Sequence, residues 1–300
     1  MLPLTLVTGF LGSGKTTLLR RIASRDSSRR YVFVVNDFAK ADVDGELMKQ
    51  TDSPVLSVAG GSIFCICKVT DFIERLNEVW DRFGKIDPPI DGVIVEASGM
   101  ADPRVVRKLI RDAELEDRFE LRGVIGVVEP TSLMKLLQTL PNIKAQIEAA
   151  DLILVNKADL HNESAMTAAE TELRTINPNA RLVRTSHCDV DIDPLDPFAA
   201  RPLEGGYADC RDPHYHDVTV TVDQPIDLAA FQAEVAAMGD AVFRVKGSVL
   251  TPDGWRFIEY AGGRWTDNHP AQAGGLAIIG HGPCIDRINA LAATLTASTN

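Results

Sequence analysis

The stretch Gly9-Phe10-Leu11-Gly12-Ser13-Gly14-Lys15-Thr16 fits the pattern G-x-x-x-x-G-K-[ST] and decides the fold. An apolar run at 4–8 precedes it and a helix-like run at 15–25 follows it, which is the context of a phosphate-binding loop. Glycines let successive N–H groups turn toward phosphate oxygens, and the helix N-terminus adds partial positive charge. We expect a nucleotide to be bound by Gly12, Ser13, Gly14, Lys15, Thr16 and Thr17.

Strand and helix patterns alternate around this loop from residue 1 to about 185. The expected strands are 4–8, 31–35, 55–58, 92–96, 122–128, 152–155 and 181–184, several of them continuous apolar runs. The expected helices are 15–25, 69–83, 103–112, 142–149 and 163–176. This alternation predicts an α/β fold, a doubly wound and mostly parallel P-loop domain over residues 1–187.

The composition of the chain changes after residue 187. Residues 188–213 are rich in Asp, Pro and Gly without periodicity, which is typical of a linker. Strand patterns then recur at 216–223, 241–250, 255–261 and 274–280, with helices expected near 227–238 and 284–297. Residues 214–300 are therefore expected to form a smaller α+β domain.

Composition and charge limit the classes of function. Lys and Arg total 31 against 42 Asp and Glu, a net charge of −11. So acidic a chain is a poor general binder of nucleic acid or anionic membrane, and we expect neither as a partner. Five cysteines do not suggest a disulfide framework, and no apolar run is long enough to span a membrane. The N-terminus lacks a basic leader, so we expect a cytoplasmic protein.

Two further motifs indicate which nucleotide binds. Asn156-Lys157-Ala158-Asp159 follows the strand at 152–155, where the Asp159 carboxylate can accept hydrogen bonds that guanine donates and adenine does not. Glu96 ends another apolar strand and is followed by Ser98-Gly99. At this position we expect a second acid for Mg²⁺ beside the Thr16 hydroxyl, and a glycine that senses the γ-phosphate. The sequence thus predicts GTP with Mg²⁺.

Together these segments resemble the CobW-type GTPases. The resemblance rests on VTGFLGSGKTTLL, VVNDFAKADVDGEL, GGSIFC, VEASGMADP and ADLILVNKADL, in that order, and on HYH at 214–216 with FRVKG at 243–247. It implies a GTPase that loads or delivers a transition metal, such as zinc or cobalt, to a client metalloprotein or cobalamin-related enzyme. It also implies a first switch at 36–46 containing Asp37, a second switch at 96–99, and guanine recognition by Asn156, Lys157 and Asp159. Lys15, Asp37, Glu96 and Gly99 would be the catalytic residues.

The chain departs from the family at the thiol motif. The family pattern is Cys-x-Cys-Cys after a glycine pair, and this chain has Ser62-Ile63-Phe64-Cys65, followed by Cys67. Two thiolates at this spacing can bind a soft or borderline metal, although they are too few for a closed tetrahedral site. Cys65 and Cys67 are therefore either candidate metal ligands or small buried apolar residues.

Three functions follow as hypotheses. The first is a slowly hydrolysing GTP switch that acts as a metallochaperone or metalloenzyme activator. The second is a GTPase conformational chaperone with no metal site of its own. The third, a small-molecule kinase, is disfavoured by the guanine-reading motif. The sequence does not identify the metal or the client protein. It also leaves the oligomeric state open, and a homo-oligomer is one of the possibilities.

Overall fold

A computed structural model describes residues 1–25, 28–37, 53–59, 61–66, 68–198, 203, 205–208, 215–222, 224–261, 263–281 and 284–296. Two compact units follow one another along the chain. The described residues up to 208 form the first unit, and those from 215 onward form the second. Each unit has its own sheet and its own hydrophobic core.

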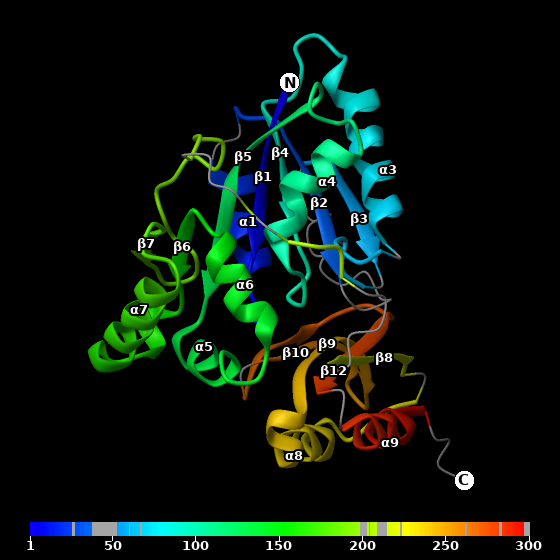
Figure 1. The fold of residues 1–300 in the computed structure, drawn as a ribbon. Coiled ribbons are helices and arrows are strands. Elements are labelled where there is room, and N and C mark those ends of the chain that lie inside the picture. The colour runs from blue at the N-terminus through cyan, green and yellow to red at the C-terminus, as the bar shows by residue number, and fades with distance from the viewer. Residues whose placement is uncertain are drawn as a thin grey trace. The chain divides into compact units, whose positions relative to one another are not determined.

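The first unit is built on a seven-stranded parallel sheet (Figure 1). The strand order is β3-β2-β4-β1-β5-β6-β7, and every adjacent pair is parallel. The strands are β1 (Leu2–Thr8), β2 (Tyr31–Asp37), β3 (Val55–Ala59), β4 (Gly92–Glu96), β5 (Phe119–Val128), β6 (Leu152–Val155) and β7 (Arg181–Arg184). All seven expected strands are confirmed.

Helices lie on both faces of this sheet, as a doubly wound fold requires. They are α1 (Lys15–Arg25), α3 (Val69–Val79), α4 (Val106–Asp112), α5 (Pro130–Leu136), α6 (Pro141–Ala149) and α7 (Glu163–Ile176). A π-helical turn (Trp80–Gly84) extends α3, and a 3-10 turn (Pro103–Val105) leads into α4. The predicted α/β fold class is thereby confirmed.

The strand sequences explain this two-sided burial. Alternate residues of a strand point to opposite faces, so both faces must be apolar when both are covered. Val32 and Val34 of β2 pack in the core that contains α3 and α4. Tyr31, Phe33 and Val35 pack in the core that contains α1.

Helix α5 was not expected from the sequence, because it is short and lacks clear periodicity. Its N-terminus is defined by local chemistry: Glu129 accepts hydrogen bonds from the backbone N–H groups of Thr131 and Ser132. Pro130 occupies the first helical position, where its missing N–H costs nothing. The cap therefore determines where α5 begins.

The described parts of the expected linker belong to the first unit and pack against its sheet and core. The backbone N–H of Phe198 donates to the carbonyl of Arg122, and Leu195 is buried in the α1-side core. Ala208 forms an isolated parallel bridge with Cys65. Aspartates and prolines in this stretch give it the composition of a linker although it contacts the domain at several points.

The second unit is an antiparallel sheet with two helices, which confirms the expected α+β class. The strand order is β11-β10-β9-β12-β8. The elements are β8 (Tyr215–Thr221), α8 (Leu228–Met238), β9 (Val242–Thr251), β10 (Gly254–Ala261), β11 (Arg264–Pro270), β12 (Gly275–His281) and α9 (Ile285–Thr296). The polar edge strand β11 was not expected, because its sequence RWTDNHP has no apolar alternation.

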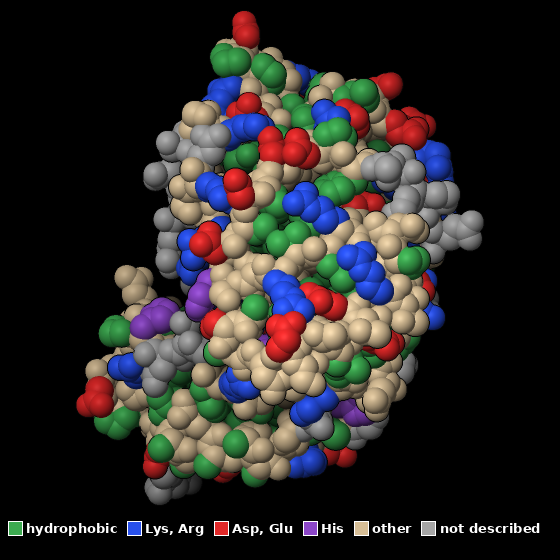
Figure 2. Space-filling model, turned by 90° about the vertical axis from the view of Figure 1, so that its left-hand side faces the viewer, with side chains coloured by type: hydrophobic (Ala, Val, Ile, Leu, Met, Phe, Trp, Pro, Cys, Tyr) green, Lys and Arg blue, Asp and Glu red, His purple; other side chains and the backbone are tan. Residues whose placement is uncertain are grey.

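The surface carries charges of both signs. Figure 2 shows one face of the molecule, on which Lys and Arg side chains lie interspersed with Asp and Glu. An example is Arg184 of β7, which bonds the carboxylates of Glu163 and Glu170 on α7. Among the described residues, no helix has the length and apolar character needed to cross a bilayer.

Leu76 of α3 tests how much the sheet depends on its helix layer. It is 0% exposed, and truncation to Ala should lower the free energy of unfolding by about 2–5 kcal/mol because a cavity remains. Leu160 is 51% exposed, so Leu160→Ala is the matched control and should cost less than about 1 kcal/mol. Urea unfolding followed by circular dichroism measures both, and equal losses would contradict the packing described here.

Candidate nucleotide and magnesium site

The loop between β1 and α1 has the backbone that its glycines predict. Gly9, Gly12 and Gly14 adopt positive φ angles of 138°, 74° and 118°. A Cβ atom at Gly9 would lie 2.1 Å from the carbonyl oxygen of Val127, and one at Gly14 would lie 2.4 Å from Nδ2 of Asn156. Neither position tolerates a side chain, because both the backbone angle and the space require glycine.

Lys15 and Thr16 begin α1, directly after the loop. Lys15 is only 5% exposed, and its ammonium donates back to the carbonyl of Phe10 at 3.3 Å, across the mouth of the loop. The Thr16 hydroxyl donates to the two carboxylate oxygens of Glu96 at 3.2 and 3.3 Å. The structure therefore brings together the two residues predicted to hold magnesium.

Three buried hydroxyl groups around the loop find no hydrogen-bond partner among the residues that the structure describes: Thr8 at the end of β1, Ser13 in the loop, and Ser98 after β4. Buried polar groups in native proteins are almost always paired, so such a cluster is typical of a site completed by a ligand. Together with the Thr16 and Glu96 oxygens, these groups fit a phosphate chain and a hard cation such as Mg²⁺.

The guanine motif is tied to the phosphate loop by a side-chain amide. Asn156, which follows β6, donates from Nδ2 to the carbonyl of Ser13 at 2.8 Å and is 2% exposed. Its Oδ1 accepts the backbone N–H of Cys188 at 3.0 Å, and the Cys188 thiol donates to the carbonyl of Gly14 at 3.3 Å. Three segments far apart in sequence thus meet at one point.

Asp159 lies on the 3-10 turn Ala158–Leu160, with Lys157 before it in the left-handed conformation at φ 61°. Its backbone N–H donates to the Ser186 hydroxyl at 3.1 Å, and its carboxylate lies 3.9 Å from Nε2 of His187. A separate hydrogen bond between Ser186 and the Asp159 carboxylate is the main cause that lowers the pKa of Asp159 below its usual value. The carboxylate is therefore ionised at neutral pH, as an acceptor for guanine must be.

Ser186 and Cys188 were not singled out by sequence reasoning as part of this site. Cys188 is the first residue of the stretch 188–213 that was expected to be a linker. Burial raises its pKa to about 12, so the thiol stays protonated and acts as a hydrogen-bond donor to the loop. Their place in the sequence could have indicated this role. Both residues directly follow β7, and the carboxyl end of β7 lies beside that of β6, which precedes Asn156.

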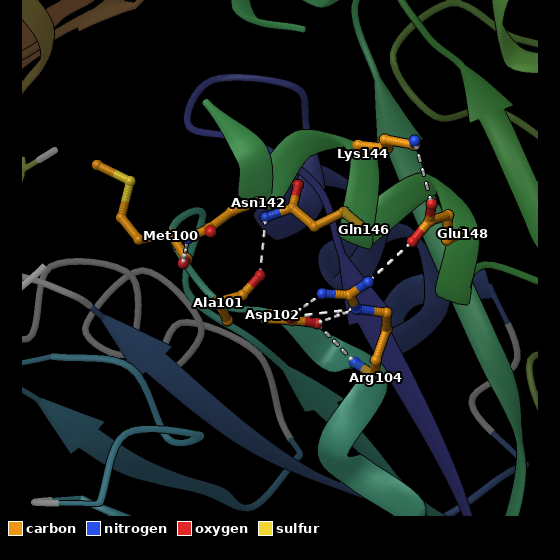
Figure 3. A network of polar contacts seen from close by, with 8 residues as sticks. All are labelled: Met100, Ala101, Asp102, Arg104, Asn142, Lys144, Gln146 and Glu148. Carbon is orange, nitrogen blue, oxygen red and sulfur yellow. Dashed lines mark hydrogen bonds and ion pairs between the residues drawn. The ribbon is translucent and has the colours of Figure 1, made fainter. Parts of the chain in front are cut away.

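The second-switch segment packs against the phosphate loop. A Cβ atom at Gly99 would lie 2.7 Å from the backbone nitrogen of Leu11, so only glycine permits this approach. Figure 3 shows how α6 holds the same segment. Gln146 donates to the carbonyls of Gly99 and Ala101, both at 3.0 Å, and Asn142 donates to the carbonyl of Met100 at 2.6 Å.

An ion network continues this attachment. Arg104, on the turn before α4, bonds Asp102 at 2.7 Å and reaches Glu148 of α6 at 2.9 Å (Figure 3). The hydrogen bond to Asp102 is the first cause that raises the pKa of Arg104. Neither Gln146 nor Asn142 was expected in the site. Both side chains donate to backbone carbonyls, and any residue type provides a carbonyl, so no sequence motif marks these contacts.

The remaining predicted residues are only partly placed. Asp37 is the last residue of β2, and its side chain lies outside the described part of the chain, as does all of Cys67. Cys65 is 5% exposed, lies four residues before the first residue of α3, and has its sulfur in a disulfide bond. Among the residues that the structure describes, no group of three or more His, Cys, Asp and Glu side chains is placed to hold a metal ion.

A comparison with protein families decides the classification. The model described as CobW/HypB/UreG, nucleotide-binding domain, matches residues 3–184. The chain belongs to the CobW/HypB/UreG family. Membership confirms the predicted resemblance and the predicted class of enzyme, a P-loop GTPase.

Several curated relatives of this chain have names that refer to zinc. The zinc chaperone YjiA of Escherichia coli is 26% identical over 277 residues, covering 89% of this chain and 82% of that protein. The zinc-regulated GTPase metalloprotein activator 1 of Dictyostelium discoideum is 27% identical, covering 86% of this chain and 63% of that protein. Against the zinc chaperone CobW of Pseudomonas aeruginosa the identity is 28%, covering 65% of this chain and 59% of that protein. The match thus spans less than two thirds of the latter two relatives.

Solved structures with a similar fold include Zn(II)-bound YjiA GTPase from E. coli. It is 21% identical with a TM-score of 0.47, covering 98% of both chains. HypB from Helicobacter pylori in complex with nickel is 17% identical with a TM-score of 0.45, covering 63% of this chain and 80% of that chain.

Gly14 provides a direct test of the loop geometry. In Gly14→Ala the new methyl group would meet the Asn156 amide, so we expect nucleotide affinity to fall by about 100-fold or more with the second unit unaffected. Gly239→Ala is the matched control, because Gly239 also has a positive φ of 54° but nothing within 4 Å of its Cβ position. Fluorescent GTP-analogue titration measures both, and equal affinities in the two variants would refute the geometry.

Proposed function

We propose that this protein is a GTP-dependent, magnesium-requiring switch that hydrolyses GTP slowly and hands a transition metal to a client metalloprotein. The observation that carries the proposal is the Asn156 bridge between the phosphate loop and the guanine motif. Such a bridge supports one nucleotide bound at both ends. Guanine would be read by Asp159 with Asn156 and Lys157, and the phosphates by Gly12 to Thr17.

The residues of the site have separate roles in this proposal. Lys15 places its ammonium against the β- and γ-phosphates, once it leaves the Phe10 carbonyl. Thr16 and Glu96 provide the oxygen ligands for Mg²⁺, which would supply neutralisation of the developing phosphate charge. Gly99 offers a backbone N–H close to the loop, and Asp37 at the end of β2 is proposed to act from the first switch.

Slow turnover is proposed because no arginine from the described residues has been identified as reaching the phosphate site. The ammonium of Lys15 and Mg²⁺ are then the only cations assigned to the transition state. Isolated switch GTPases of this kind turn over at about 10⁻⁴ to 10⁻² s⁻¹. A client or partner that supplies a further charge would accelerate the reaction.

The metal part of the proposal rests on the relatives' names and on Cys65. Two relatives are named zinc chaperones and a third a zinc-regulated activator. Cys65 lies at the family's thiol position, and after reduction its thiolate could serve as a ligand to a borderline metal such as zinc. Zinc is proposed as the cargo, with cobalt as the alternative, and Cys67 as the second ligand.

A second candidate function is a GTPase conformational chaperone without a metal site of its own. It is favoured by the loss of two thiols from the Cys-x-Cys-Cys pattern at residues 62–65, where Ser62 and Phe64 stand instead. In both cases the partners are GTP and a client protein. We propose no nucleic acid or membrane partner and a cytoplasmic location, and a homo-oligomer is compatible with either candidate function.

The nucleotide assignment is tested with Asp159→Asn. The neutral amide keeps the size of the side chain but cannot accept both hydrogen bonds from guanine, so GTP affinity should fall by about 10–100-fold while ATP affinity changes little. Competition of ATP and GTP against a fluorescent analogue measures the ratio. Asp117→Asn is the control for charge removal on the same unit. Equal wild-type affinities for ATP and GTP would refute guanine specificity.

The metal assignment is tested with Cys65→Ser. In the presence of reductant and a non-hydrolysable GTP analogue, the wild type should bind about one zinc ion and the variant should bind it at least about 10-fold more weakly. Cys284→Ser is the matched control, because it removes a half-buried free thiol from the second unit. Equilibrium dialysis measures the affinities, and identical values for Cys65→Ser and wild type would favour the second candidate function.

A further inference from the structure

Asn36 makes an unusually complete set of hydrogen bonds. Strand β2 lies between β3 and β4 (Figure 1). Asn36 is the next-to-last residue of β2 and is 1% exposed. Its Nδ2 donates to the carbonyls of Val58 and Gly61 at 3.0 and 2.8 Å. Its Oδ1 accepts the backbone N–H groups of Ile63 and Ser98 at 3.0 and 3.1 Å.

These four bonds use the whole capacity of one amide. A flipped amide would place its NH₂ against two N–H donors and its oxygen against two carbonyls, so the orientation is fixed by the surroundings. Aspartate has no donors for the carbonyls of Val58 and Gly61, and serine is too short to span the four groups. Only asparagine satisfies this position, and glutamine would need extra space that a fully buried site lacks.

One partner, Val58, lies on β3, and the other three belong to two functional segments. Ser98 immediately precedes Gly99, whose backbone packs on Leu11 of the phosphate loop. Gly61 and Ile63 belong to the turn that leads to Cys65. Asn36 is therefore the single side chain among the described residues seen to bond both segments directly.

Backbone hydrogen bonds link the turn at residues 61–63 to Cys65. The N–H of Cys65 donates to the carbonyl of Ser62 at 2.9 Å, and the N–H of Phe64 donates to the Ser62 hydroxyl at 3.2 Å. The carbonyl of Cys65 in turn accepts N–H groups from Lys68 and Val69 at the start of α3, both at 2.9 Å. A displacement of Ile63 must therefore move the Cys65 backbone or break this turn.

We propose that Asn36 is the positioning residue that couples the nucleotide at the phosphate loop to the Cys65 segment. This inference rests on the proposed function, since it describes how that site is regulated. A γ-phosphate that draws the Ser98–Gly99 backbone toward itself also pulls on Oδ1 of Asn36. The amide follows, carries the Gly61 carbonyl and Ile63 N–H with it, and changes the geometry offered by the Cys65 thiol.

The coupling must act in both directions. If GTP alters the affinity of the Cys65 segment for zinc by some factor, zinc alters the affinity for GTP by the same factor. Couplings of this kind are typically about 5- to 150-fold. Without Asn36 the two segments would respond independently, and the factor should approach 1.

The first experiment uses the wild type and needs no metal. Residue-resolved hydrogen exchange compares the protein with GDP–Mg²⁺ and with a non-hydrolysable GTP analogue–Mg²⁺. The N–H groups of Ile63 and Ser98 both bond Asn36, so their exchange rates should change together by about fivefold or more. A change at Ser98 with none at Ile63 overturns the proposal.

The second experiment compares Asn36→Ser with Asn177→Ser. Asn177 is a matched control: it is 3% exposed, and its amide donates to the carbonyls of Ile147 and Ala150 at 2.7 and 2.8 Å. It joins the ends of α6 and α7 and bonds neither segment. Zinc affinity is measured by competition with a chromogenic chelator, in reductant, at saturating GDP or GTP analogue.

The wild type and Asn177→Ser should show the same GTP-to-GDP ratio of zinc affinity, about fivefold or more away from 1. Asn36→Ser should show a ratio within about twofold of 1 while still binding the nucleotide. A wild-type ratio retained in Asn36→Ser overturns the coupling. Absence of zinc binding in every state would instead overturn the proposed metal role, and hydrogen exchange at Ile63 would then decide the coupling alone.

Discussion

The parallel register between β1 and β4 is the constraint on which the site depends. It pairs Val7 with Glu96, so β4 ends level with the start of the phosphate loop. The Glu96 carboxylate then lies within 3.2 Å of the Thr16 hydroxyl although 80 residues separate them. A shift by one residue would turn Glu96 to the opposite face of the sheet. Continuous apolar strands, buried on both faces, fix this register because every other alignment exposes or misplaces several side chains.

Two buried amides convert this alignment of strand ends into a connected site. Asn156 joins the phosphate loop to the guanine motif, and Asn36 joins the second switch to the turn before Cys65. Each net hydrogen bond contributes about 1 kcal/mol, but leaving a buried partner unpaired costs about 1–3 kcal/mol. That asymmetry makes both amides hard to replace. In the proposed coupling, Asn36 is the point at which a change in the Ser98–Gly99 segment reaches the turn before Cys65.

Much of the fold and part of the site could be predicted from the sequence. Apolar strands, glycine positions and the residues of the phosphate loop depend on local chemistry, and the seven strands of the first sheet were all found. Glu96 and Thr16 were expected to meet, and they do. By contrast, the roles of Asn36, Gln146 and Cys188 depend on which backbone groups lie opposite them. Backbone carbonyls and N–H groups leave no signature in sequence, so these contacts could not be foreseen.

Contacts with neighbouring segments also explain the other elements in which the structure differs from the sequence-based expectation. Helix α5 begins because Glu129 caps it, and β11 forms because β10 offers it an edge, although its own residues have little strand character. The stretch after residue 187 has the composition of a linker, yet Cys188 and Phe198 hydrogen-bond to the first unit. The residue types of these segments therefore did not predict which neighbours the segments pack against.

In the proposed mechanism, this protein couples GTP binding to zinc binding at the Cys65 segment. The most direct measurement is calorimetric titration of the reduced wild-type protein with a non-hydrolysable GTP analogue, with and without zinc, together with the reverse titration. The account predicts that zinc and nucleotide change each other's affinity by one and the same factor, about fivefold or more. Affinities that are independent of each other in both directions, within error, would contradict it.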